Sequence, residues 1–226
     1  MNLDGASILV AGASGGLGSA LARELSEHGA NLLLHGRDRV RLAALGAESH
    51  HPTFVADLRE PGAAELAVTA AIARHGRLDG VVCAVGVLAF GPVATLADAT
   101  LEELFATNVL VPIRLARAAL GVLGPGGQLV NVSGIVAETP MAGLAAYSGS
   151  KAALSAFDAA LRRESRAQGV HVLDVRPPHL ETGLSDRPIA GMPPRLPAGV
   201  DPADAAAAIV AAMAADRREV AAYTPV

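Results

Sequence analysis

The sequence predicts a single α/β domain built on a doubly wound sheet of seven strands, mostly or wholly parallel, with helices on both faces. Short β-type runs alternate with longer helical stretches over all 226 residues, which is the pattern of parallel α/β folds. Several of the β-type runs are apolar throughout, as in strands that helices cover on both faces. Half of the residues are hydrophobic, with many alanines and no tryptophan, a composition that suits a sheet covered by alanine-rich helices.

The strands are expected at the short runs rich in Val, Leu and Ile, and the helices at the longer stretches between them. In chain order, the strands are predicted at 7–11, 31–35, 53–56, 80–85, 128–133, 170–176 and 220–223. The helices are predicted at 17–28, 37–45, 62–75, 101–121, 144–168 and 202–215. Glycines that can adopt a positive φ stand where helices are expected to end, at Gly29, Gly46, Gly76, Gly124 and Gly169.

No linker or internal repeat divides the chain, so residues 1–226 are predicted to form one domain. The one long irregular stretch is 183–200, which contains four prolines. A long loop inside a compact domain usually has a function. We therefore expect 183–200 to be a substrate-binding loop within the domain.

Charge and composition exclude several classes of function. The net charge is −4 and no basic run is present, which argues against nucleic acid as a partner. The longest apolar run, 205–215, is too short to span a membrane. Cys83 is the only cysteine, which excludes an internal disulfide and fits a reducing compartment. No signal peptide is apparent, so the protein is expected in the cytoplasm. No metal site is expected, because His50 and His51 lack further ligands at metal-binding spacing.

A glycine-rich segment, 12–18, directly follows the first predicted strand and precedes a predicted helix. Glycines let the backbone approach a diphosphate, and the start of the helix offers free N–H groups and the positive end of the helix dipole. The spacing can be read through Gly12, Gly16 and Gly18, or through Gly12, Gly15 and Gly18. No Gly-Lys-Ser/Thr follows, so the segment is not the phosphate loop of nucleotide hydrolases.

The only lysine of the chain, Lys151, stands four residues after Tyr147, one of two tyrosines. Positions i and i+4 lie on one face of a helix. An ammonium group there is expected to lower the pKa of the phenol, because it stabilises the charged form. The pair therefore indicates a tyrosine that exchanges a proton with a substrate.

With these residues the chain resembles the short-chain dehydrogenase/reductase family, of the classical type, over essentially its whole length. The glycine segment and the Asp57-Leu58 pair match its cofactor-binding motifs, and 176–182 matches its segment around the nicotinamide. Its catalytic tetrad is matched in order by Asn108, Ser133, Tyr147 and Lys151. Two motifs depart from the family: residues 83–86 read Cys-Ala-Val-Gly instead of Asn-Asn-Ala-Gly, and a second proline, Pro178, replaces the glycine of a Pro-Gly pair.

The resemblance implies a Rossmann fold and an oxidoreductase that interconverts a carbonyl and an alcohol. It implies that Ser133 holds the substrate oxygen, Tyr147 is the general acid/base, and Lys151 stabilises the tyrosinate and holds the nicotinamide ribose. Asn108 is expected to bind a water that links Lys151 to solvent. The expected cofactor contacts are Gly12, Ser14, Gly16, Leu17, Gly18, Arg37, Asp57, Leu58, Ala84, Gly86, Asn108, Tyr147, Lys151, Pro177, Leu180 and Thr182.

The cofactor is predicted to be NADP(H) rather than NAD(H). An NAD-selective fold of this kind carries an acidic residue at the end of the second strand, for the ribose hydroxyls. Gly36 stands there instead, and Arg37 follows it. Arg37 can bind a 2′-phosphate with two charge-assisted hydrogen bonds, and Ser14 can add a third contact.

The substrate is expected to be a small or medium, apolar carbonyl compound or alcohol, whose identity and reaction direction the sequence leaves open. Four apolar loop residues suggest its pocket: Phe90, Met141, Leu144 and Met192. Next to the nicotinamide segment, His179 can be a substrate contact or an ordinary loop residue. Two further functions stay open, a non-catalytic NADP(H)-binding regulatory protein and an epimerase or dehydratase with transient cofactor use.

The protein is predicted to be a homodimer or homotetramer. The predicted helices 101–121 and 144–168 carry more apolar residues than one core-facing stripe needs. The resemblance implies that these helices pair across a two-fold axis. The residues expected at that surface are Ala116, Ala119, Leu120, Ala152, Phe157 and Ala160.

Overall fold

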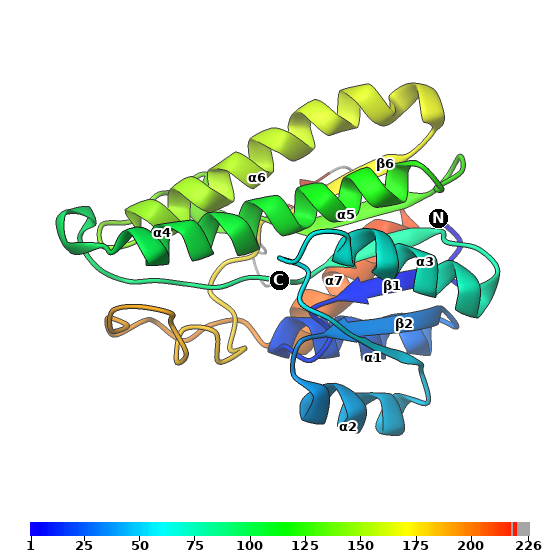
Figure 1. Ribbon diagram of the computed structural model, residues 1–226, viewed down its shortest axis with the longest axis horizontal. Helices are drawn as coiled ribbons and strands as arrows, with labels where there is room; N and C mark the ends of the chain where they lie inside the picture. The colour runs from blue at the N-terminus through cyan, green and yellow to red at the C-terminus, as the bar shows by residue number, and fades with distance from the viewer. Residues whose placement is uncertain (218, 221–226) are drawn as a thin grey trace.

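Seven parallel strands form one sheet in the order β3-β2-β1-β4-β5-β6-β7, in a computed structural model that describes residues 1–217 and 219–220 (Figure 1). The strands are β1 (Ser7–Ala11), β2 (Asn31–Gly36), β3 (Thr53–Val55), β4 (Gly80–Cys83), β5 (Gln128–Val132), β6 (His171–Val175) and β7 (Glu219–Val220). β1 pairs with both β2 and β4, so Val10 lies between Leu34 and Val82. The chain reverses its direction of winding there, and in such folds ligands bind at the carboxyl ends of the strands beside this point. The predicted parallel, seven-stranded α/β fold is confirmed.

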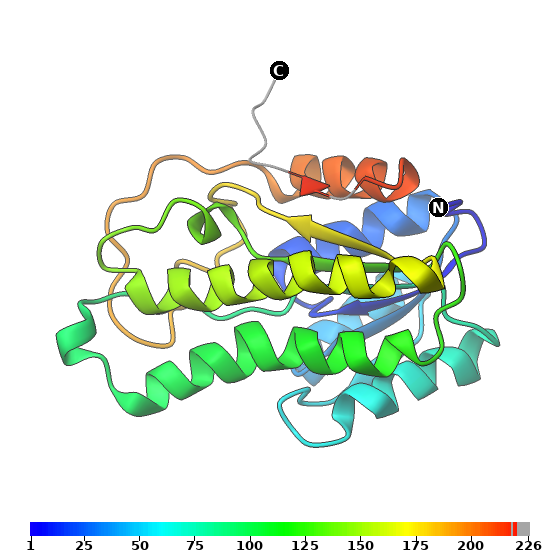
Figure 2. The ribbon, with the colours of Figure 1, turned by 90° about the horizontal axis from the view of Figure 1, so that it is seen from above.

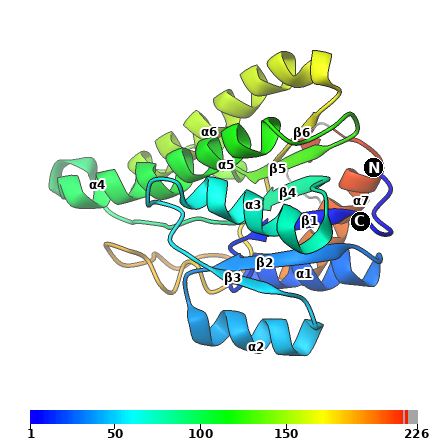
Figure 3. The same cartoon turned by 45° about the vertical axis from the view of Figure 1, so that its right-hand side comes forward.

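Helices cover both faces of the sheet (Figure 3). Their apolar sides form one core cluster with α1 (Gly16–Glu27), α2 (Arg39–Ser49) and α7 (Pro202–Ala214), and another with α3 (Ala63–His75), α5 (Val111–Leu120) and α6 (Ala145–Glu164). Successive strand residues alternate between the clusters: Ile8 and Val10 belong to the first, Leu9 and Ala11 to the second. Cys83 is buried in the second cluster, as expected of a core residue.

The second helix begins and ends later than predicted. Asp38 caps it, since its carboxylate accepts hydrogen bonds from Val40 N and Arg41 N, each at 3.0 Å. Arg37 therefore precedes the helix instead of opening it. The helix continues through Gly46 and ends only at His50, which has a left-handed φ of 58°.

The predicted helix 101–121 begins earlier and contains an irregularity. It consists of α4 (Asp98–Phe105), a π-helical turn η2 (Ala106–Leu110) and α5. The turn holds one residue more than an α-helical turn, and such insertions occur often at functional sites. Asn108 stands in the middle of this turn.

The loop 183–200 and the start of α6 lie beyond the carboxyl ends of the strands (Figure 2). The predicted helix 144–168 is α6 followed by a 3₁₀ turn, η4 (Ser165–Gln168), that ends at Gly169 with a φ of 69°. The last predicted strand, 220–223, falls mostly outside the described residues; within them β7 covers Glu219–Val220. Among the described residues, no helix is long and apolar enough to cross a membrane.

Part of the surface expected for oligomer formation is buried inside the monomer. Ala116 and Ala119 are 2% and 0% exposed, because this side of α5 faces α3 and the sheet. The large apolar residues exposed on the continuous helix α4–η2–α5 are instead Leu101, Phe105 and Leu110, on α4 and η2. The oligomeric state stays a prediction.

Candidate active site

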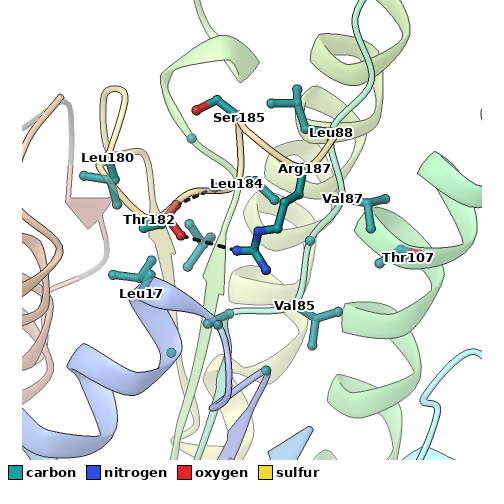
Figure 4. A pocket seen from close by; sticks show the side chains of 18 of the residues that line it. Leu17, Val85, Val87, Leu88, Thr107, Leu180, Thr182, Leu184, Ser185 and Arg187 are labelled. Carbon is teal, nitrogen blue, oxygen red and sulfur yellow. Dashed lines mark hydrogen bonds between the residues drawn. The ribbon is translucent and has the colours of Figure 1, made fainter. Parts of the chain in front are cut away.

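A cleft of about 550 Å³ opens at the carboxyl edge of the sheet, where β1 and β4 end and the 183–200 loop approaches. Its walls come from the glycine segment, the residues that follow β2, β4, β5 and β6, and the start of α6. One part of the wall is polar and carries arginines, and another part is apolar. Figure 4 shows a close view, with Leu17, Val85 and Leu88 on the wall and Arg187 pointing inward.

The glycine segment packs so closely that side chains have no room at three of its positions, Gly12, Gly16 and Gly18. Gly12 has a φ of 82°, and a Cβ there would lie 2.9 Å from the carbonyl carbon of Ala84. A Cβ on Gly16 would lie 2.7 Å from the Cα of Thr182. The glycine segment therefore touches the segments that follow β4 and β6 through backbone alone. Such a surface, at the start of a helix, suits the diphosphate of a dinucleotide.

Positive side chains line the cleft where β2 ends, together with Asp38, which pairs with Arg41 at 3.4 Å, and Asp57. Arg37 and Arg41 line it, and Ser14 lies so near that its Oγ would be 2.7 Å from a Cβ on Gly36. Arg37 Nη1 lies 3.9 Å from Asp57 Oδ2, but Arg59 is the closer partner of that carboxylate, at 2.7 Å. The Arg59 hydrogen bond is the main reason that the pKa of Asp57 is lowered.

Tyr147 and Lys151 meet on one face of α6 at the cleft. Lys151 Nζ lies 5.9 Å from the centroid of the Tyr147 ring and donates a hydrogen bond to Val132 O at 2.7 Å. Lys151 is only 5% exposed. Beside Tyr147 the wall is apolar and includes Leu88, Phe90 and Leu144.

Burial controls the protonation of both groups. It raises the pKa of Tyr147 to about 12 and lowers the pKa of Lys151 to about 8. The net shift of the Tyr147 pKa is therefore upward, opposite to the lowering expected from the neighbouring Lys151. The cost of desolvating a tyrosinate outweighs the effect of an ammonium that lies beside the ring. At pH 7 the phenol is neutral, and it can donate a proton.

Ser133, whose hydroxyl is expected to hold the substrate oxygen, lines the cleft and has a partner within the protein. Its side chain is 0% exposed, and its Oγ donates to Asp174 Oδ1 at 2.5 Å. Ser155 of α6 donates to the other oxygen of the same carboxylate at 2.7 Å, and Arg176 Nε lies 3.6 Å away. The proton that Ser133 would offer a substrate is thus already donated to a buried carboxylate. In the sequence, the acidic Asp174 inside an otherwise apolar predicted strand could have indicated a buried carboxylate that needs hydrogen-bond donors.

The side chain of Asn108 is also fully engaged. Its Oδ1 accepts from Val87 N and its Nδ2 donates to Val87 O, both at 2.9 Å, and Nδ2 also donates to Ser150 Oγ at 3.1 Å. Asn108 therefore fastens the segment after β4 to the π-helical turn and to α6. A Cβ on Gly86 would lie 3.6 Å from both Asn108 Oδ1 and Lys151 Nζ, which brings the three positions together.

A family model described as short chain dehydrogenase matches residues 6–190. The chain belongs to the short-chain dehydrogenase family. It is therefore an oxidoreductase, and NAD(P)H is the cofactor typical of its family.

Two curated relatives of this dehydrogenase illustrate the range of the match. An uncharacterized oxidoreductase of Methylorubrum extorquens is 33% identical over 196 residues, which cover 84% of this chain and 79% of the relative. The 3-oxoacyl-[acyl-carrier-protein] reductase FabG of Escherichia coli is 29% identical over 209 residues, covering 88% and 85% of the two chains. Only the second name states a substrate, which is a property of that relative.

Solved structures of the family include complexes with a cofactor. A short-chain dehydrogenase from Burkholderia cenocepacia in complex with NADP has a TM-score of 0.87 and 25% identity, and covers 98% of this chain and 97% of that one. A blue fluorescent protein from a metagenomic library, in complex with NADPH, has the same TM-score and coverage with 26% identity.

Of the residues expected to serve catalysis or cofactor binding, all except Asn108 line the cleft of this dehydrogenase. Phe90, Met141 and Leu144 line it too, but Met192 is 85% exposed and lies outside it. The N–H of Leu180 has no hydrogen-bond partner among the described residues, so it is free to bind a ligand despite the preceding Pro178. Residues that sequence reasoning did not select also line the cleft, among them Arg41, Thr107, Ser185 and Arg187.

Proposed function

We propose that the protein is an NADP(H)-dependent reductase that interconverts a carbonyl and an alcohol on a small or medium, apolar substrate. One observation carries the proposal. A half-buried Tyr147 beside Lys151 adjoins the apolar wall of the same cleft that has a glycine segment and Arg37 elsewhere on its rim. The cleft thus combines a proton donor, an apolar substrate wall and an anion-binding surface.

In the proposed mechanism, the glycine segment and Lys151 would hold a reduced nicotinamide dinucleotide, which would supply a hydride to the carbonyl carbon. Tyr147 donates its phenolic proton to the carbonyl oxygen, because its raised pKa keeps the phenol protonated at neutral pH. The charge of Lys151 stabilises the tyrosinate that forms. One of its three N–H donors binds Val132 O, which leaves two for the nicotinamide ribose. Ser133 and Asn108 position the surrounding elements.

The cofactor preference rests on the end of β2. Gly36 places no acidic side chain at this end, and Ser14 Oγ lies 2.7 Å from where a Cβ on Gly36 would be. Arg37 and Arg41 instead bring positive charge to this end of the cleft. An acidic residue would repel a 2′-phosphate, whereas these side chains attract it.

The first test measures the dissociation constants of NADPH and NADH by calorimetry. Wild type should bind NADPH more tightly, and Arg37→Ala should lose about 1.5–2 kcal/mol for NADPH and almost nothing for NADH. The loss is limited because the Arg37 side chain is 47% exposed, so solvent screens its charge. Arg39→Ala is the matched control, since Arg39 is exposed and lies outside the cleft lining. A wild-type preference for NADH would contradict the assignment.

The second test is a reductase screen over ketones and aldehydes, followed by the absorbance of NADPH. Oxidation of NADPH that requires an apolar carbonyl compound supports the proposal. Tight cofactor binding with no net cofactor turnover on any carbonyl would instead support a regulatory protein or an epimerase or dehydratase.

A further inference from the structure

Arg187 brings a positive charge into the cleft from the 183–200 loop. In Figure 4 its guanidinium points from the loop toward Val85 and lies beside Thr182. Its Nε donates to Gly183 O at 2.9 Å and its Nη2 to Thr182 O at 3.4 Å. Among the described residues, no carboxylate forms an ion pair with it. Its partners within the described part of the chain are therefore neutral backbone carbonyls.

The same Thr182 carbonyl rests on the glycine segment. A Cβ on Gly16 would lie 2.8 Å from Thr182 O, so the oxygen that Arg187 binds touches the first residue of α1. Gly15, the N-cap of α1, offers no side-chain cap, and the first turn holds no acidic residue. The first N–H groups of the helix have no intrahelical partner, and the dipole makes this end positive. Two positive elements thus face one part of the cleft.

We propose that Arg187 binds the diphosphate of the cofactor and thereby fastens the 183–200 loop over the bound dinucleotide. This inference rests on the proposed function. Of the anionic groups of NADP(H), the diphosphate is the one that binds at a helix N-terminus, whereas the 2′-phosphate belongs beside Arg37. A phosphate oxygen gives Arg187 a charge-assisted hydrogen bond, which is stronger than its present bonds to carbonyl oxygens.

The experiment compares wild type with Arg187→Gln by calorimetry, using NADPH, NADH and adenosine 2′-monophosphate. Arg187→Gln should weaken NADPH and NADH by a similar factor of about ten, because both contain the diphosphate. Adenosine 2′-monophosphate lacks the diphosphate, so its affinity should not change. Arg195→Gln is the matched control, because Arg195 belongs to the same loop but is exposed and does not line the cleft.

A second readout is hydrogen exchange of the loop amides. NADPH should protect residues 183–191 in wild type and in Arg195→Gln, but much less in Arg187→Gln. The inference is overturned if Arg187→Gln binds both dinucleotides as wild type does, if it loses affinity for NADPH alone, or if its loop is protected as in wild type. If wild type binds neither dinucleotide, the proposed function itself fails, so the two failures are distinguishable.

Discussion

Replacing Ser133 by alanine tests whether its hydroxyl serves the substrate or the buried Asp174. The structure offers a matched partner, because Ser155 donates to the other oxygen of the same carboxylate. Both Ser133→Ala and Ser155→Ala remove one hydroxyl donor from Asp174. Only Ser133 belongs to the catalytic tetrad that the family resemblance implies.

The magnitudes follow from the contacts. A hydrogen bond to a charged acceptor contributes about 1.5–3 kcal/mol to stability. Ser133 is 0% exposed and its bond is 2.5 Å long, so we expect its loss to lower the free energy of unfolding by about 2–3 kcal/mol. Ser155 is half-buried with a 2.7 Å bond, so about 1–2 kcal/mol is expected. If Ser133 does not touch the substrate, kcat should fall less than about tenfold in either variant.

The assay combines urea unfolding with steady-state reduction of the best carbonyl compound from the screen, at a temperature where both variants are folded. NADPH affinity is measured in parallel, to separate cofactor binding from chemistry. Loss of a donor that stabilises a reacting oxygen typically costs about 100- to 1,000-fold in kcat. A loss of that size in folded Ser133→Ala with normal NADPH affinity, and not in Ser155→Ala, would refute the reasoning.

Two further perturbations address the proton donor and the buried acid of α6. Tyr147→Phe should keep NADPH affinity but lose about 100- to 10,000-fold in kcat, because only the proton donor is removed; near-full activity in steady-state assays would contradict its role. Burial raises the pKa of Asp158 from 3.8 to about 8, so the acid favours folding at low pH, and its contribution is lost as pH rises from about 4 to about 8. Relative to Asp158→Asn, which preserves the side-chain shape beside Asn131, wild type should lose on the order of 1 kcal/mol of unfolding free energy per pH unit between pH 5 and pH 8. Urea unfolding at several pH values measures this slope, with the exposed Asp186→Asn variant as the control. If the free energy of unfolding depends on pH in the same way in wild type and Asp158→Asn, Asp158 is ionised in the folded protein and the expectation is wrong.

The sheet could be predicted from the sequence because each central strand is a short apolar run between helices of ordinary length. The strand 7–11 begins and ends as expected, since the residues on both of its faces are buried. Helix ends were harder to place. The second helix begins after its N-cap, Asp38, and continues through Gly46. This glycine does not end the helix; a Cβ there would lie 2.5 Å from Thr53 Cγ2, so close packing against Thr53 accounts for the small residue.

The parts of the candidate site that could be predicted are those formed by residues close to each other in the sequence. Tyr147 and Lys151 share a helix face, and the glycine segment is continuous in the chain. The direction of the Ser133 hydroxyl was not predictable from its own surroundings, because its partner, Asp174, lies on the neighbouring strand. The placement of Arg187 likewise depends on how an irregular loop folds back onto the glycine segment.

The π-helical turn η2 (Ala106–Leu110) joins α4 and α5 into one continuous helix whose two halves direct different sides toward the rest of the protein. One extra residue rotates every later side chain by about 100° around the helix axis. Before the turn, α4 contacts α6, while after it α5 contacts α3 and β4. Deleting one residue here would restore an even helix but turn α4 away from α6, and would release Asn108 from Val87. The π-helical turn thus sets the rotation between α5, which packs in the hydrophobic core, and α4, and it places Thr107 and Val111 in the wall of the cleft.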